Sequence, residues 1–208
     1  MPTATFLRLS ASKQKRIIDA AVKEFSVRNV QEGKLSNIVK DAGISRGSLY
    51  QYFPSKEDLY NYLFDTLRAD RAEYVKPAFA LYKTEPFLRF FEEFYLRDSE
   101  FLLMNPSHIE LGKQMYGSTD SVSRGLIHRL QTRYKEWFLV AIEHDKEKGI
   151  IDHRVSSSTL ADLFVHFVTD IFIFQSVHSQ FSVVNIREHC RETMYIIWNG
   201  IRTQPEFP

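Results

Sequence analysis

Residues 45–56 gather side chains that can hydrogen-bond to the edges of nucleic-acid bases and to phosphates. Arg46 carries a planar guanidinium that can donate to the O6 and N7 acceptors of guanine together, and Gln51 carries an amide suited to adenine. Ser48 can bond either kind of base edge. Gly47 has no side chain to hold the backbone away from a partner. This combination predicts direct contacts with base edges in a DNA major groove.

A pair of short helices separated by a tight turn must position these side chains. Helical spacing predicts one helix over 35–42 that stops at Gly43, and a second over 46–52 with Ser45 as its N-cap. Pro54 prevents the second helix from continuing. Such a pair is the helix-turn-helix pattern, in which the second helix enters the major groove.

The remaining chain is also predicted to be helical, so the fold class is all-α. Ser12 is expected to cap the first helix, and no sustained alternation of apolar and polar residues indicates a strand. We expect a DNA-binding domain over residues 1–54 and, joined to it by a long helix, a second all-helical domain over 55–208. The further helices are expected at residues 12–28, 56–76, 86–104, 106–116, 120–148, 158–179 and 185–202.

Charge is distributed unevenly along the chain. The net charge is only +1, yet residues 1–56 hold ten Lys/Arg against four Asp/Glu, which leaves the remainder with 17 against 22. A basic first quarter suits phosphate neutralisation. The single cysteine forms no internal disulfide, and neither a secretory signal nor an apolar run of about 20 residues is found, so a cytoplasmic protein is expected.

The segment "DAGISRGSLYQYFPSKEDLYNYLF", Asp41 to Phe64, closely resembles the DNA-binding signature of the TetR/AcrR family of transcriptional regulators. The match reaches back to Ile17 and covers about the first third of the chain. In that family a ligand-binding and dimerisation region follows the DNA-binding head, so the resemblance implies a ligand-binding and dimerisation domain over 55–208. Asn29 and Gly33 depart from the family pattern, which commonly has glycine and threonine there. The residues expected to contact DNA bases, sugars or phosphates are Lys34, Ser36, Ser45, Arg46, Gly47, Ser48, Tyr50, Gln51, Tyr52 and Lys56.

The second region is dense in large apolar side chains, which favours a pocket for a hydrophobic or amphipathic molecule within a packed core. Asp170 is unusual in its apolar helix, because burying a carboxylate without a partner is costly. It either pairs with a basic group across a dimer or meets a cationic group of a ligand. The pocket candidates are Phe91, Phe94, Tyr95, Met104, Met115, Tyr116, Trp137, Phe167 and Asp170.

The last two helices are more apolar than one subunit needs, and the family resemblance implies a four-helix dimer interface there. The interface candidates are Phe164, Phe167, Ile171, Phe174, Met194, Ile197 and Trp198. Two heads about 34–36 Å apart can enter successive major grooves, and a ligand that changes this spacing would weaken DNA binding. We expect the helix that starts at Lys56 to carry this change.

Together these features predict a bacterial, nucleoid-associated repressor that a small molecule releases from a pseudo-palindromic operator. The alternative is an architectural or interaction protein that uses the same head without a small-molecule ligand. An enzyme is not expected, because the sequence has no HExxH pair, phosphate loop or nucleophile elbow. Neither a metal nor a cofactor is predicted.

Overall fold

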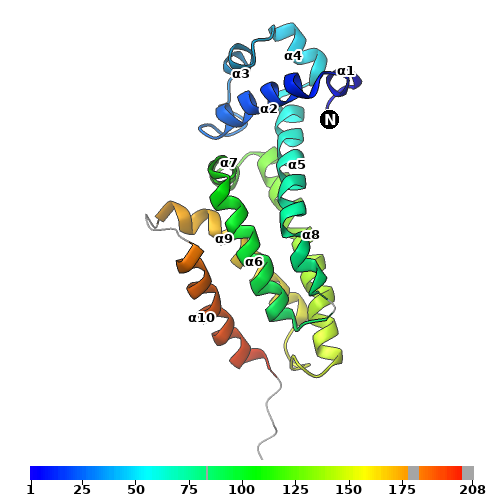
Figure 1. Cartoon of the computed structure of the whole chain (residues 1–208), viewed down its shortest axis with the longest axis vertical. Helices are drawn as coiled ribbons and strands as arrows, with labels where there is room; N and C mark the ends of the chain where they lie inside the picture. Colours follow the sequence, from blue (N-terminus) through cyan, green and yellow to red (C-terminus); the bar gives the residue numbers. More distant parts are fainter. Residues whose placement is uncertain (83, 178–182, 203–208) are drawn as a thin grey trace, which may run out of the picture. The chain divides into compact units, whose positions relative to one another are not determined.

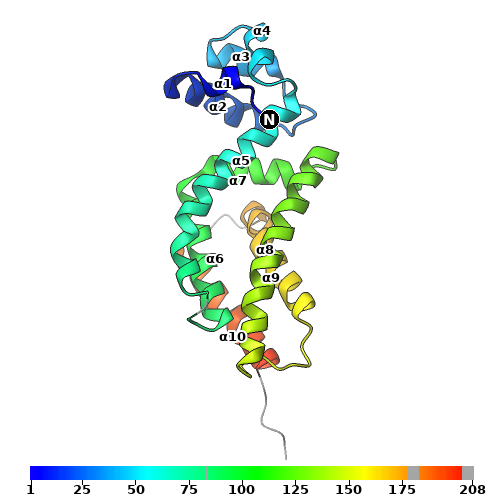
Figure 2. The same cartoon turned by 90° about the vertical axis from the view of Figure 1, so that its right-hand side faces the viewer.

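The computed structural model describes residues 1–82, 84–177 and 183–202, without the side chains of residues 170–184. Every regular element in these ranges is helical, and one isolated antiparallel bridge joins Ile151 to Arg202. Figures 1 and 2 show the helices from two sides. They are α1 (Ala4–Leu7), α2 (Ala11–Phe25), α3 (Leu35–Ala42), α4 (Arg46–Tyr52), α5 (Lys56–Val75), the 3-10 helix η1 (Lys76–Ala80), α6 (Phe87–Met104), α7 (Pro106–Tyr116), α8 (Ser121–Glu147), α9 (Ser157–Val177) and α10 (Val183–Ile201).

The chain forms two compact units, each of which uses two separate stretches of sequence. The head unit comprises Met1–Asp70 and Asn105–His128, and the body unit comprises Arg71–Met104 and the chain from Arg129 onward. Helices α5 and α8 each supply residues to both units. The division predicted after residue 54 concerns function and stays a prediction, whereas compactness assigns most of α5 to the head unit.

The head unit closes around one apolar core. Its largest fully buried side chains are Phe6, Phe25, Phe53 and Tyr60, from α1, α2, the residue after α4, and α5. Helix α7 packs against α2 and adds Leu111 and Met115 to this core, and the start of α8 adds Leu126. The three helices of the predicted DNA-binding domain are therefore completed by residues from the middle of the chain.

The body unit closes around a cluster of aromatic rings. Phe87, Phe90, Phe91 and Phe94 of α6 meet Phe138 of α8 and Phe164 of α9, and all six side chains are fully buried. We call these six residues the aromatic cluster. Edge-to-face pairs dominate it, with ring centroids only 4.4 Å apart between Phe91 and Phe164.

Two buried carboxylates organise the helices around this cluster. The Asp145 side chain of α8 accepts a hydrogen bond from the Phe87 backbone N–H (2.7 Å) and so caps the start of α6. Burial raises the pKa of this carboxyl, although the Phe87 bond and nearby cationic groups oppose the rise. Asp98 of α6 is paired with the Arg71 guanidinium at the end of α5. Sequence reasoning singled out neither acid.

The predicted helices are confirmed to within a few residues at each end, but some local features differ. Ser10, not Ser12, precedes the first residue of α2, so the cap prediction was wrong by one half-turn. Gly43 adopts a left-handed conformation (φ 62°) and ends α3 as predicted. Helices α1 and η1 were not predicted, because each is only about one turn long and lacks an apolar period. Within the described ranges, no helix combines the length and the apolar character that crossing a membrane requires.

Candidate nucleic-acid interface

Helix α4 begins and ends where its sequence dictates. The Ser45 hydroxyl accepts a hydrogen bond from the Ser48 backbone N–H (3.0 Å), which satisfies one of the free donors of the first turn. The backbone extends at Phe53, and Pro54 follows. Ser45 is therefore confirmed as the N-cap, and the helix is a short element of seven residues.

The two faces of α4 have opposite character. Leu49 and Tyr52 are buried in the head core, whereas Arg46, Gly47 and Gln51 are exposed. The Arg46 guanidinium lies over the exposed ring of Tyr50, 5.9 Å from its centroid. A side-chain carbon added at Gly47 would find only the Ser45 hydroxyl within 4 Å, so this part of the helix is open to a close approach. The exposed face thus offers hydrogen-bond donors and acceptors around a bare backbone position.

Tyr52 is placed differently from its neighbours on α4. Its side chain is only 5% exposed and packs against Phe6, with the Lys13 ammonium 5.7 Å from the ring centroid. The contact with the sugar-phosphate backbone that the resemblance implied stays a prediction. The structure gives the Tyr52 ring a packing role.

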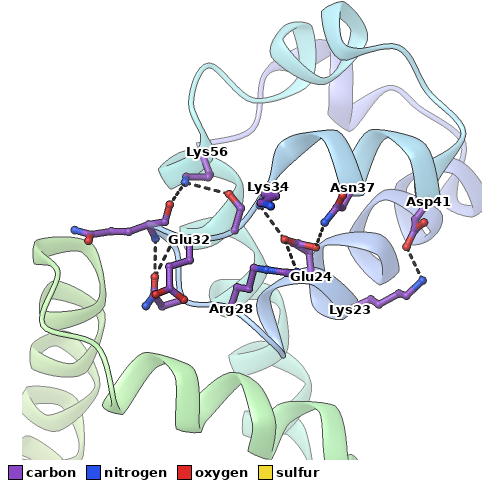
Figure 3. A network of polar contacts seen from close by, with 11 residues as sticks. Lys23, Glu24, Arg28, Glu32, Lys34, Asn37, Asp41 and Lys56 are labelled. Carbon is purple, nitrogen blue, oxygen red and sulfur yellow. Dashed lines mark hydrogen bonds and ion pairs between the residues drawn. The ribbon is translucent and has the colours of Figure 1, made fainter.

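The start of α3 is held by a buried carboxylate from α2 (Figure 3). Glu24 Oε1 accepts from the Lys34 backbone N–H (2.8 Å) and from the Arg28 guanidinium (3.1 Å). Its Oε2 accepts from the Asn37 side-chain amide (2.8 Å). Burial alone would raise the pKa of this carboxyl, but the three donors outweigh burial and lower it. Glu24 therefore stays ionised and ties the end of α2 to the start of α3.

Lys56 holds the same loop from the other side. Its ammonium donates to the carbonyl oxygens of Gln31 (2.8 Å) and Gly33 (3.2 Å), as Figure 3 shows. A lysine ammonium has three N–H groups, so one donor is left for a phosphate. Lys34 and Ser36, the other predicted phosphate contacts, are exposed at the start of α3.

The two departures from the family pattern have local physical reasons. The Asn29 side-chain oxygen accepts from the backbone N–H groups of Gln31 and Glu32, both at 3.0 Å, and this forms the turn after α2. Gly33 lies against the buried Phe25 ring, where a side-chain carbon would come within 2.5 Å of a ring atom. The loop is thus shaped by these residues themselves.

The predicted pocket residues fall into separate groups. Phe91, Phe94, Tyr95 and Phe167 contact one another or the rest of the aromatic cluster, and Trp137 contacts Tyr134 at its edge. Met104 is 58% exposed, while Met115 and Tyr116 belong to the core of the head unit. The Asp170 side chain lies outside the described residues. The structure therefore groups five of the nine candidates in or beside the aromatic cluster, and their role as a pocket stays a prediction.

The predicted dimer residues are divided in a similar way. Phe164 and Met194 are buried within a single protomer. Phe167, Ile197 and Trp198 are half-buried, and the side chains of Ile171 and Phe174 lie outside the described residues. Phe164 and Met194 therefore pack in the core of a single protomer, and the role of the seven predicted residues in a dimer stays a prediction. Among the side chains of α10 that the structure describes, the large apolar ones that are exposed are Tyr195 and Ile196, each at 71%.

Sequence reasoning did not identify three residues that position elements of the head unit. Phe6 and Thr3 lie before the first predicted helix, and Glu24 was counted only as a charge. The signal for Phe6 was its place among apolar residues that precede a serine N-cap. At Glu24 the only local signal is the i, i+4 spacing to Arg28, because its other two partners lie 10 and 13 residues away.

Comparison with known proteins identifies the helices that carry this interface. Residues 17–63 match the family model "Bacterial regulatory proteins, tetR family". These residues belong to the TetR family. The match confirms the resemblance of Asp41–Phe64 and makes α3 and α4 the helix-turn-helix of the TetR head.

Individual relatives match over a similarly short part of the chain. The HTH-type transcriptional regulator YdgC of Bacillus subtilis is 49% identical over 47 residues, 23% of this chain and 24% of YdgC. A fatty acid metabolism regulator of the same bacterium is 42% identical over 57 residues, 25% of this chain and 29% of that protein. The chain thus aligns with only about a quarter of the length of these relatives.

Similarity over the whole chain shows the fold. A TetR-family regulator from Chloroflexus aurantiacus has a TM-score of 0.72 at 19% identity, over 98% of this chain and 100% of that one. NalD, the secondary repressor of the MexAB-OprM multidrug efflux pump in Pseudomonas aeruginosa, has a TM-score of 0.74 at 16% identity, over 95% and 100%. The all-α fold predicted from the sequence is therefore that of TetR-family regulators.

Proposed function

We propose that this protein is a transcriptional regulator that reads DNA with the exposed face of α4. One observation carries the proposal: Arg46, Gly47 and Gln51 are exposed on one side of a short helix whose other side is buried. A helix of this kind can enter a major groove without side chains that keep its backbone away. Arg46 and Gln51 supply the base-reading groups, with Ser48 beside them.

Phosphate contacts would set the register of this helix on the duplex. Lys34 and Ser36 are exposed at the start of α3, where the Lys34 ammonium and the Ser36 hydroxyl can bond to phosphates. Lys56 binds the loop that precedes α3, and its ammonium has one N–H left for a DNA phosphate. These contacts position the head and predict a strong dependence of affinity on salt.

We infer that two copies bind a pseudo-palindromic site. A dimer places two copies of α4 about one helical turn of DNA apart, roughly 34–36 Å. The body unit offers an apolar surface for it, because Tyr195 and Ile196 of α10 and Leu163 of α9 are each at least 50% exposed. We place the second copy over these side chains and not over the buried Phe164.

We propose that the protein is a repressor and that a hydrophobic or amphipathic effector releases it from DNA. The support is the aromatic character of the body unit, since binding sites for such molecules are lined by apolar and aromatic side chains. Two related proteins are named as a fatty acid metabolism regulator and an efflux-pump repressor. Because its partner would be chromosomal DNA, we place the protein in the bacterial cytoplasm at the nucleoid.

Selection from a random duplex library tests the DNA-binding proposal. We expect enrichment of inverted repeats, and affinity for the selected duplex that falls by about a thousandfold or more between 50 and 200 mM salt if each dimer makes six or more phosphate contacts. A library that returns no preferred sequence, or binding that salt leaves unchanged, would refute the proposal. Thermal-shift screening with fatty acids, aromatic acids and lipophilic cations then tests the effector class.

A further inference from the structure

A short segment at the start of the chain, Thr3–Leu9, lies against the end of α4. The Thr3 backbone N–H donates to the Tyr52 carbonyl oxygen (2.9 Å), and the Thr3 hydroxyl donates to the Gln51 carbonyl oxygen (2.6 Å). Carbonyls in the last turn of a helix have no partner within that helix. Thr3 therefore supplies hydrogen bonds that α4 cannot make for itself.

Phe6 fixes the same segment to the apolar side of α4. Its side chain is fully buried, with its ring centroid 4.7 Å from that of Phe53, 5.4 Å from Tyr62 and 6.1 Å from Tyr52. Tyr52 is the last residue of α4, and Phe53 directly follows it. Phe6 thus fills the space between the end of α4 and the first turns of α5.

The other end of the segment is tied to α2. The Gln14 side-chain amide of α2 donates to the carbonyl oxygens of Leu7 (3.2 Å) and Leu9 (3.0 Å). Within the segment, the Thr3 hydroxyl accepts from the Phe6 N–H at 3.4 Å and caps α1. The segment therefore bridges α2, a long helix of the head unit, and the end of α4.

We propose that Thr3–Leu9 is a positioning segment that fixes the orientation of α4 for sequence-specific DNA binding. A helix of seven residues is not stable alone, so contacts with the rest of the head must set its direction. Base recognition depends on that direction, because the reading side chains must reach base edges while phosphate contacts hold the head in place. None of this requires Thr3, Phe6 or Gln14 to touch DNA. The inference rests on the proposed function only in taking α4 as the reading helix.

The test compares Thr3→Val with Thr3→Ser in the full-length protein. Valine keeps the side-chain shape and the backbone N–H but removes the hydroxyl, whereas serine keeps the hydroxyl. Gln14→Ala is a second variant, which releases the segment from α2 without changing a residue that contacts α4. Each protein is measured by fluorescence anisotropy on a selected duplex and on a scrambled duplex, and by hydrogen exchange without DNA.

We expect Thr3→Val and Gln14→Ala to weaken binding to the selected duplex by about fivefold or more, because each variant removes two hydrogen bonds of the segment and the net effect of one corresponds to about fivefold. Binding to the scrambled duplex depends on charge, so it should change less than about twofold. Backbone amides of α4 should exchange faster, those of α2 should not, and Thr3→Ser should behave as the unaltered protein.

The proposal would be overturned if both variants kept the hydrogen-exchange rates of the α4 amides and the affinity for the selected duplex unchanged. Equal losses on both duplexes with faster exchange throughout the head unit would also overturn it, because that pattern means general destabilisation. If the unaltered protein prefers no duplex, the function proposed for α4 fails. The exchange comparison then still decides whether the segment positions α4.

Discussion

The head unit and the body unit form their cores by different means. In the head unit, specific polar contacts fix the backbone: Glu24 holds the start of α3, and Lys56 holds the loop before it. In the body unit, six buried phenylalanine side chains pack ring against ring in one cluster. Both units bury an apolar core, but the loop that positions the head interface depends on the direction of individual hydrogen bonds, whereas the centre of the body unit depends mainly on apolar volume.

This difference explains why the sequence predicts particular functional side chains in the head unit but only a packed apolar core in the body unit. A surface that must meet DNA requires particular side chains at particular backbone positions, such as Arg46 beside Gly47. An aromatic core requires only volume, and many sequences supply it.

The largest effect is expected at the centre of the aromatic cluster. Phe138→Ala removes a fully buried ring that contacts Phe87, Phe91, Phe94 and Phe164. We expect the free energy of unfolding to fall by about 4 kcal/mol, from lost burial and the cavity left behind. Chemical denaturation monitored by hydrogen exchange of α6 and α8 peptides measures this loss.

Phe138→Leu is the control for that change. It keeps most of the volume, so the loss should be less than about 1.5 kcal/mol if the body unit depends on volume alone. A leucine variant as unstable as the alanine variant would break the comparison between the two units.

The head unit should not tolerate even one added methyl group at Gly33. The new carbon would lie 2.5 Å from a ring atom of Phe25, which is fully buried and cannot move away. We expect Gly33→Ala to lower the free energy of unfolding by about 3 kcal/mol through overpacking. Gly47→Ala is the matched control, since its nearest new contact is 3.9 Å away. It should leave stability unchanged or slightly higher and weaken DNA binding, and equal stability of both variants would contradict the account of the loop.

Glu24→Gln should reduce the free energy of unfolding by about 2 kcal/mol at neutral pH. In the unaltered protein, N–H donors bond to the Glu24 carboxylate, and in the variant some of them would face the NH₂ group of the glutamine amide instead. Folding lowers the pKa of Glu24 below its usual value of 4.5. The carboxylate therefore stabilises the fold above that value, and the contribution is lost as the pH falls through the lowered pKa.

Denaturation of both proteins between pH 3 and 7 tests this, with Glu32→Gln as a control at an exposed carboxylate. The difference between unaltered protein and Glu24→Gln should shrink on acidification. A difference that is independent of pH would show that the charge of Glu24 is not what holds α3.

Sequence reasoning predicted most of the fold because long amphipathic helices, caps and breakers act locally. Ser45, Gly43 and Pro54 each fix a helix end through their own backbone or side chain, so their effects can be inferred without a structure. Phe164 and Met115 could not be assigned in this way. Both are apolar residues on apolar helices, and only the packing shows that one belongs to the body core and the other to the head core.

Polar residues with distant partners were also out of reach. The cap on α6 comes from Asp145, 58 residues away, and Thr3 bonds to Gln51, 48 residues away. Tyr52 resembled a DNA-contacting position by its motif, but the sequence could not show that Phe6 covers its ring. Such contacts depend on tertiary structure, which a local pattern does not encode.

Base readout by α4 is tested most directly by comparing Arg46→Ala with Lys15→Ala on a set of duplexes that carry every single-base change in one half-site. Lys15 is an equally basic exposed residue of the head unit, paired with Asp19 on α2. We predict that Arg46→Ala loses about tenfold in affinity and loses discrimination at one base position only, with folding stability unchanged. Lys15→Ala should keep full discrimination at every position. Uniform weakening by both variants across all duplexes would contradict the claim that this helix reads sequence.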